Sequence, residues 1–243
     1  MENGTVNTKS WWIIVGGRRR LGRALAEALS IDFNLILTSS VSWEHETGWV
    51  EELSKQTKLR CLSWNAKDED IAITIMNDME SLKTEGIAPK CMILASGNFQ
   101  ENLLGQWSPK DLATTWQINL TFPLLIIQTV SNYFVDNSCI QILLDTSIYK
   151  PFLKRIPHSI AEAGLQTMVS GLAHLLAPKT RVVGHALGVV MHNPETDPGD
   201  LIDKSLLKKI GSPKDLELAL RFVANSLYLT GTIITLDGGM HIK

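Results

Sequence analysis

A segment near the start of the chain has the residue types and the spacing that bind phosphate. The apolar run 11–15 leads into Gly16-Gly17-Arg18-Arg19-Arg20-Leu21-Gly22, and helix-forming residues follow over 23–29. Glycines allow the backbone to turn tightly, and the N-terminus of a helix presents free N–H groups and the positive end of its dipole to an anion. Strand, turn and helix in this order predict a site for the pyrophosphate of a dinucleotide. An ordinary strand–turn–helix connection is the alternative interpretation.

The side chains around this loop indicate which dinucleotide it would hold. Arg20 replaces the middle glycine of the usual G-x-G-x-x-G spacing, and the arginines at 18–20 are suited to phosphate. The next apolar run, 34–38, ends in Ser39-Ser40, where NAD-binding folds have a carboxylate for the adenosine ribose 2′-hydroxyl. Hydroxyl groups and arginines fit a 2′-phosphate, so the sequence favours NADP(H) over NAD(H). The alternative is that the serines only terminate the strand.

The composition bounds the class of protein. Its 243 residues, 44% of them hydrophobic, are enough for one large α/β domain. The 23 basic and 25 acidic residues nearly balance, which argues against a nucleic acid or a membrane as the main partner. Residues 1–10 lack the apolar core of a signal peptide, and no apolar run is long enough to span a bilayer. We expect a loosely ordered tail at 1–10 and a single soluble, cytoplasmic domain at 11–243.

The cysteines and most of the histidines show no pattern of metal ligands. The three cysteines have no metal-ligand spacing, and their odd number argues against a disulfide framework. No paired ligand spacing connects the histidines His45, His174, His185, His192 and His241. The sequence therefore predicts no metal site.

Strand-like and helix-like segments alternate along the chain. Apolar runs predict strands at 11–15, 34–38, 59–64, 91–95, 139–144, 181–186 and 231–236. Helical composition predicts helices at 23–29, 44–55, 65–85, 110–134, 160–176, 201–210 and 213–225. This alternation predicts a Rossmann-type α/β fold, a doubly wound parallel sheet between two layers of helices.

Residues that directly follow strands are the candidate ligand contacts, because ligands of such sheets bind beyond the carboxyl ends of the strands. Outside the loop, the candidate cofactor contacts are Ser39, Ser40, Asn65, Ala95, Ser96, Gly97 and Gly188. The candidate substrate contacts are Phe99, Tyr149 and Met191. Phe99 could stack on a planar ring or serve as a core or lid aromatic. The proline-containing segment at about 190–210 is predicted to be a lid over the substrate site.

The order of these motifs resembles the short-chain dehydrogenase/reductase family over nearly the whole chain. The loop is similar to that of the pteridine reductase branch, in which an arginine stands at the middle glycine, and Asn119-x3-Pro123 resembles the central helix of that branch. Three further stretches match the family pattern: Leu175-Leu176-Ala177-Pro178-x2-Arg181-Val182, Gly211-Ser212-Pro213 and Thr230-Gly231-x5-Asp237-Gly238-Gly239. The resemblance implies a Rossmann fold and a nicotinamide-dependent oxidoreductase.

The match fails at the positions that carry the family's chemistry. The family uses a tyrosine to transfer a proton, a lysine four residues later, and a serine 13 residues before the tyrosine, replaced by aspartate in pteridine reductases. Here those positions hold His158, Glu162 and Asp145, of which only Asp145 agrees with that branch. The resemblance also implies that Asn119 holds water or backbone near them. On the cofactor side, the family's residues are replaced by Asn65, Leu94, Ala95 and Leu187.

Two interpretations of these replacements remain open. Glu162 cannot supply the cation of the family's lysine, but two carboxylates beside His158 favour a protonated imidazole, which is a competent general acid. The three residues could then form a non-standard proton-transfer group for NADPH-dependent reduction of a pterin-like or carbonyl substrate. The alternative is a catalytically silent pseudoenzyme that senses cofactor or serves as an oligomer partner, with or without bound cofactor. Tyr149, Lys150 and Lys154 could in principle supply a phenol and an ammonium instead.

The two long predicted helices, 110–134 and 160–176, are strongly apolar. The resemblance implies that they pack against the same helices of a second subunit. We therefore expect a homodimer or a homotetramer, whose partner surface is a copy of its own.

Overall fold

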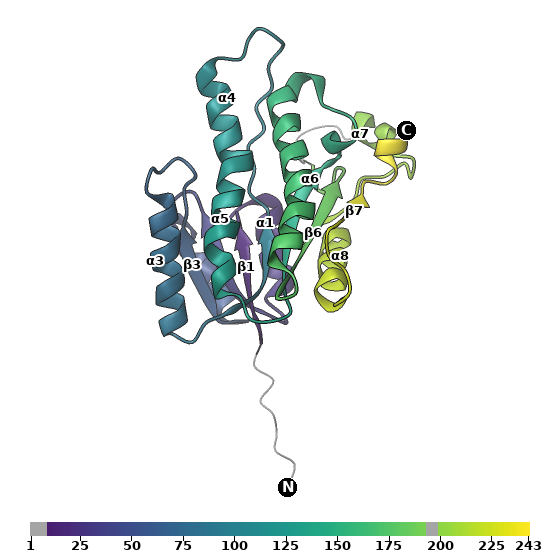
Figure 1. Ribbon diagram of the computed structural model, residues 1–243. Helices are drawn as coiled ribbons and strands as arrows, with labels where there is room; N and C mark the ends of the chain where they lie inside the picture. Colours follow the sequence, from purple (N-terminus) through teal and green to yellow (C-terminus); the bar gives the residue numbers. More distant parts are fainter. Residues whose placement is uncertain (1–8, 193–198) are drawn as a thin grey trace.

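The centre of the fold is a parallel β-sheet (Figure 1). The computed structural model describes residues 9–192 and 199–243. Within these ranges the sheet has seven strands in the order β3-β2-β1-β4-β5-β6-β7. They are β1 (Trp11–Val15), β2 (Asn34–Ser39), β3 (Leu59–Ser63), β4 (Pro89–Leu94), β5 (Ser138–Asp145), β6 (Thr180–Leu187) and β7 (Thr232–Leu236). The strand order reverses between β1 and β4, which confirms the predicted doubly wound Rossmann-type sheet.

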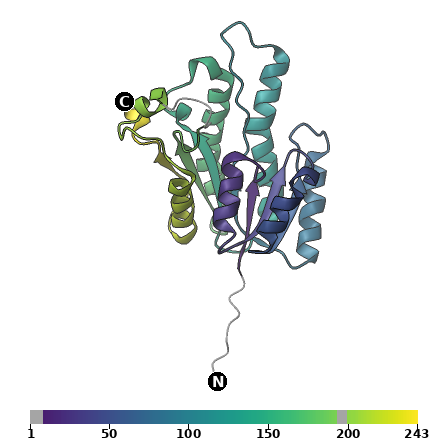
Figure 2. The ribbon, with the colours of Figure 1, turned by 180° about the vertical axis from the view of Figure 1, so that it is seen from behind.

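Helices cover both faces of the sheet, because successive side chains of a strand point to opposite faces. On one face Ile13 and Val15 join the core formed with α3 (Ile71–Thr84), α5 (Phe122–Val130) and α6 (Ile156–Leu176). On the other face Trp12 and Ile14 join the core formed with α1 (Arg20–Leu29), α2 (Thr47–Ser54) and α8 (Pro213–Asn225). The two views of the ribbon show one helix layer in front of the sheet and one behind it (Figures 1 and 2).

The helix predicted at 110–134 is interrupted near its middle. α4 (Pro109–Trp116) passes into a π-helical turn, Gln117–Thr121, and then into α5. The Phe122 N–H donates to the carbonyl of Gln117, five residues back, and Pro123 has no N–H to offer the carbonyl of Asn119. π-Helical turns of this kind occur frequently at functional sites. This one carries the buried Asn119.

Several other helix boundaries differ from the prediction. α1 begins at Arg20 rather than at residue 23, so part of the predicted turn is already helical. α3 begins at Ile71 rather than at residue 65, because Asn65 forms a turn with the residues that follow it. α6 begins at Ile156, with proline in its first turn, where a missing N–H costs no hydrogen bond. α7 (Gly199–Lys204) is shorter than the predicted 201–210.

Two predicted segments fall partly outside the described residues. Residues 1–8 of the predicted tail and residues 193–198 of the predicted lid belong to this group. Within 9–192 and 199–243, no helix combines the length and the apolar character that crossing a bilayer requires.

Candidate active site

The loop between β1 and α1, predicted to bind phosphate, turns tightly through left-handed backbone. Gly16 has a φ of +84° and Arg20 a φ of +47°, both in the left-handed region, which is unusual for an arginine. A Cβ on Gly22 would lie 2.1 Å from the carbonyl oxygen of Gly16, so only glycine lets the helix start this close to the strand. Arg19 precedes α1 and makes no side-chain cap, which leaves the first N–H groups of the helix free for an anion.

The arginine side chains of this loop have different surroundings. Arg19 and Arg20 are exposed, whereas Arg18 is only 8% exposed and forms an ion pair with Glu46 at 3.5 Å. Leu21 is partly buried in the core on the α1 side of the sheet. The loop therefore carries two exposed cations and one buried, ion-paired cation.

The candidate contacts after β2 and β3 also differ in accessibility. Ser39 is buried, and its hydroxyl accepts the N–H of Val41, whereas Ser40 is exposed. The Asn65 side chain accepts the N–H of Lys67 and donates to Asp68, which keeps it in a local turn. Ser40 is thus the freer of the two serines.

The segment after β4 forms a wall beside the loop. The Ala95 N–H donates to the carbonyl of Val15, and a Cβ on Gly16 would lie 3.1 Å from the Cα of Ser96. The hydroxyl of Ser96 is buried and has no hydrogen-bond partner in the described part of the chain. Gly97 is exposed. The backbones of the two segments therefore meet directly.

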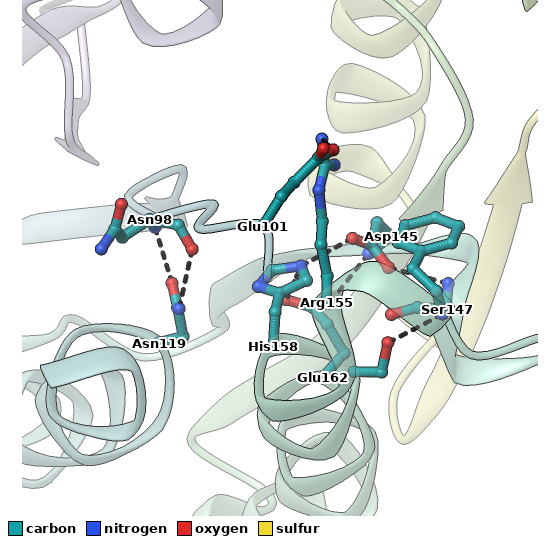
Figure 3. Close-up of polar contacts among 10 residues, drawn as sticks. Asn98, Glu101, Asn119, Asp145, Ser147, Arg155, His158 and Glu162 are labelled. Carbon is teal, nitrogen blue, oxygen red and sulfur yellow. Dashed lines mark hydrogen bonds and ion pairs between the residues drawn. The ribbon is translucent and has the colours of Figure 1, made fainter. Parts of the chain in front are cut away.

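Asn119 fixes the loop that follows this wall. Its Oδ1 accepts the N–H of Asn98 at 2.7 Å, and its Nδ2 donates to the carbonyl of Asn98 at 2.9 Å (Figure 3). Both bonds go to the backbone of one residue. The Asn119 side chain therefore holds the backbone of the 97–99 loop in place.

The structure brings the three predicted proton-transfer residues together at the end of β5 and the start of α6 (Figure 3). His158 Nε2 lies 2.7 Å from Asp145 Oδ2 and 3.6 Å from Glu162 Oε1. The second oxygen of each carboxylate accepts a backbone N–H: Ser147 donates to Asp145 Oδ1, and Asp145 itself donates to Glu162 Oε2. The two acids are thereby oriented toward the imidazole.

The pKa values of the two carboxylates are shifted in opposite directions. Burial alone would raise the pKa of Asp145, but hydrogen bonds from His158 and Ser147 outweigh it and hold that pKa below its usual value. Burial, followed by the charge of Asp145, raises the pKa of Glu162 to about 8. Asp145 is therefore the ionised partner of His158 near neutral pH, and Glu162 carries a proton.

The second nitrogen of His158 is the unusual feature of the group. The residue is 2% exposed, and its Nδ1 is buried without a hydrogen-bond partner among the described residues. The ring of Phe99 lies 4.6 Å from the imidazole ring, and the guanidinium of Arg155 lies 5.6 Å from the centre of the Phe99 ring. Arg155 also forms an ion pair with Glu101. Phe99, itself 57% exposed, covers His158.

The same three side chains are close enough to share a ligand. One ligand atom from each of Asp145, His158 and Glu162 lies within 4.8 Å of the other two, a spacing that could hold a metal ion. The sequence analysis identified these three residues as a proton-transfer group but predicted no metal site, and the cluster combines β5 with α6. In the structure, however, His158 Nε2 and Asp145 Oδ2 are already joined to each other.

The remaining candidate residues lie toward β7. The Tyr149 hydroxyl is 2.7 Å from Thr235 Oγ1, and its ring lies 4.8 Å from that of His241. A Cβ on Gly188 would lie 2.7 Å from the Cα of Asp237, so packing against the chain after β7 requires glycine there. Met191 is partly buried. The hydrogen bond to Thr235 therefore holds the Tyr149 hydroxyl at β7 and not at the His158 group.

Sequence reasoning did not find two contributors to the site. The N–H of Ser147 orients Asp145, and Glu46 pairs with Arg18. A backbone N–H carries no sequence signal. Glu46 is one of the first acids after β2 in the sequence, but the sequence does not predict its ion pair with Arg18.

Comparison with known proteins places this fold and site in a family context. The scan against protein-family models finds no match. Tropinone reductase-like 3 from Erythroxylum coca is 23% identical over 240 residues, covering 93% of this chain and 91% of that protein. Dihydromonapterin reductase from Enterobacter sp. (strain 638) is 24% identical over 234 residues, covering 93% and 95%.

Solved structures give the same result for the fold. A short-chain dehydrogenase/reductase from Serratia marcescens aligns with a TM-score of 0.87 at 17% identity, over 96% of this chain and 98% of that chain. A blue fluorescent protein from a metagenomic library, solved in complex with NADPH, aligns with a TM-score of 0.86 at 20% identity, over 96% and 98%.

Fold and loop thus define a Rossmann scaffold of the dinucleotide-binding type. The homologues and structural neighbours are short-chain dehydrogenase/reductases, dihydromonapterin reductase among them, so the resemblance found in the motifs is confirmed and the fold of this chain is that of the family. The assignment of His158 and Glu162 to the tyrosine and lysine positions stays a prediction.

Proposed function

We propose that this chain is an NADPH-dependent reductase of a small pterin-like or carbonyl substrate, with His158 as its proton donor. One observation carries the proposal: Asp145 holds one nitrogen of the imidazole at 2.7 Å, and the other nitrogen, Nδ1, is buried without a partner. A carboxylate that orients a histidine and leaves its second nitrogen for the substrate is a recurring arrangement in proton transfer.

The residues around the loop fit a bound dinucleotide. The left-handed backbone at Gly16 and Arg20, the close approach at Gly22 and the uncapped start of α1 form a cradle that a pyrophosphate would fill. Arg19, Arg20 and Ser40 are exposed beside it, and we assign them to the cofactor phosphates. When bound, NADPH supplies the hydride.

Each residue of the proton-transfer group then has a distinct role. His158 would donate its Nδ1 proton to the substrate oxygen or nitrogen, and the imidazole would later regain a proton from water. Asp145 positions the ring and stays ionised. Glu162, neutral near pH 7 because of its raised pKa, limits the negative charge beside the reacting atoms. Asn119 fixes the backbone of the 97–99 loop.

The substrate would approach from the side of Phe99. Its exposed ring covers His158, so a planar substrate would take the place of this ring on the imidazole or stack upon it. Tyr149 and Met191 stay proposed substrate contacts, and residues 193–198 of the predicted lid lie outside the described residues. Four of the similar proteins are named for dihydromonapterin, a pterin, and others for carbonyl-type substrates, which supports these two substrate classes.

The experiment combines binding with turnover. NADPH and NADH binding is measured by calorimetry, and NADPH oxidation is followed with dihydromonapterin and with a simple diketone. We expect NADPH to bind and the parent to oxidise it with at least one substrate, whereas His158→Gln binds NADPH equally but turns over about 10²-fold more slowly. Turnover by His158→Gln at the parental rate would contradict the proposed proton donor.

A second candidate function is a catalytically silent subunit of an oligomer. It is favoured by large apolar side chains that are exposed on α5, on α6 and on the segment before α6, namely Leu124, Leu153, Ile156 and Ile160. Exposed apolar side chains of this kind suit contact with a second copy. If light scattering gives a dimer or a tetramer while no substrate of the panel is reduced, this candidate replaces the reductase.

A further inference from the structure

A carboxylate holds two arginines together beside the phosphate-binding loop. Glu46 Oε1 lies 3.5 Å from Nη2 of Arg18, and its Oε2 lies 3.1 Å from Nη1 of Arg23. Arg23 in turn lies over the ring of Trp49, 4.4 Å from its centre. The carboxylate is thus the shared partner of two guanidinium groups.

This contact spans the region where the adenosine ribose of a dinucleotide would lie. Arg18 belongs to the loop after β1, and Glu46 closes the short helix Glu44–Glu46 that follows β2. β1 and β2 are parallel neighbours, so their carboxyl ends meet at the same edge of the sheet. In Rossmann folds the 2′ position of the adenosine ribose lies beyond the end of the second strand.

Arg18 is only partly satisfied by this partner. The residue is 92% buried, yet its single ion-pair contact is long, and its Nε is buried with no partner among the described residues. A guanidinium has five N–H donors, and a phosphate offers three acceptor oxygens and up to two negative charges. A phosphate would therefore satisfy Arg18 better than the carboxylate does.

We propose that Glu46 occupies, on Arg18, the place of a 2′-phosphate and competes with it for that guanidinium. The proposal rests on the dinucleotide binding of the proposed function. The carboxylate keeps the buried cation paired in the free protein, and a 2′-phosphorylated adenosine must displace it before reaching Arg18. Glu46 thereby weakens the preference for a 2′-phosphorylated nucleotide that the arginines and serines create, without acting on a nucleotide that lacks the 2′-phosphate.

The test compares two nucleotides that differ in the 2′-phosphate. Adenosine 2′,5′-bisphosphate and adenosine 5′-monophosphate are titrated by calorimetry into the parent, Glu46→Gln and the matched control Glu44→Gln, an exposed acid of the same short helix. We expect Glu46→Gln to bind the bisphosphate about tenfold more tightly, as for one charged contact, with the monophosphate unchanged. Glu44→Gln should match the parent.

Three other outcomes are distinguishable. Equal or weaker binding of the bisphosphate by Glu46→Gln overturns the role of Glu46 and leaves the proposed function intact. Failure of every variant to bind either nucleotide overturns the dinucleotide binding on which both proposals rest. Should Glu46→Gln fail to fold, Glu46→Asp, which withdraws the carboxylate from Arg18, must show tighter binding of the bisphosphate, and parental affinity in that variant overturns the inference.

Discussion

The β1–α1 loop, the proposed phosphate site, and the Asp145–His158–Glu162 group lie at the same edge of the sheet but use different parts of the chain. The loop offers backbone: left-handed φ values at Gly16 and Arg20 and the free N–H groups at the start of α1. The group at β5 and α6 offers side chains that are paired with one another. A site built mainly from backbone N–H groups depends less on the identity of its side chains than a proton-transfer group does.

Among changes to the Asp145–His158–Glu162 group, we expect the largest loss of turnover from replacing Asp145, which orients His158. Asp145→Asn keeps an oxygen for the N–H of Ser147 but removes the negative charge beside His158. We expect NADPH turnover to fall about 10²-fold with unchanged NADPH affinity. Single-turnover rates and calorimetry separate the two quantities, and a loss confined to affinity would instead make Asp145 a cofactor contact.

In the β1–α1 loop, two variants of Arg20 separate the effect of its charge from the effect of its backbone conformation. Arg20→Ala removes the cation and keeps the strained φ, whereas Arg20→Gly removes the cation and relieves the strain. We expect both variants to bind NADPH about tenfold more weakly. We expect the melting temperature of Arg20→Ala to lie below that of Arg20→Gly. Parental NADPH affinity in both variants would exclude Arg20 from the phosphate site.

The pH dependence of stability tests the raised pKa of Glu162. Its folded-state pKa of about 8 lies above the ordinary value of 4.5, so its contribution to stability is full below about pH 4.5 and is lost as the pH rises through 8. Glu162→Gln removes this titration. We expect its melting temperature to equal that of the parent near pH 5 and to exceed it by several degrees at pH 9.

Glu217 is the matched control for this measurement. Burial opposes its ionisation, but hydrogen bonds from Lys214 and Arg221 hold its pKa below the usual value. Its stabilising contribution is therefore present above the ordinary glutamate pKa and is lost as the pH falls through the lowered one. Glu217→Gln should melt below the parent at pH 7 and pH 9. The same sign of change in both variants would contradict the assignment for Glu162.

The smallest expected effect is that of metal removal. Because His158 and Asp145 are bonded to each other, the proposed proton transfer uses no metal ion. We expect NADPH turnover to be unchanged after dialysis against EDTA. Loss of turnover that returns on addition of a divalent cation would reassign the group as a metal centre.

The fold could be predicted from the sequence because its signals are local and repeated. Apolar runs alternating with amphipathic segments gave all seven described strands, and Ser212-Pro213 marked the start of α8. The interruption of the central helix was missed, because a π-helical turn depends on which carbonyl Pro123 leaves without a donor. α6 begins before the predicted start, with Pro157 in its first turn.

The sequence predicted which residues form the candidate site but not which atoms are hydrogen-bonded to each other. Motif spacing identified Asp145, His158 and Glu162, and the structure joins them. Which imidazole nitrogen Asp145 holds depends on the angle between β5 and α6, which sequence spacing does not report. The pairing of Arg18 with Glu46 depends on the path of the chain after β2 for the same reason.

Chemical rescue of His158→Gly by imidazole tests the central claim most directly. The substitution removes the buried ring beside Phe99 and leaves space for a free imidazole next to Asp145. The account predicts that turnover of NADPH falls about 10²-fold in the variant and rises with added imidazole, while the parent does not respond. Parental turnover by His158→Gly without imidazole would contradict it and would require another proton donor.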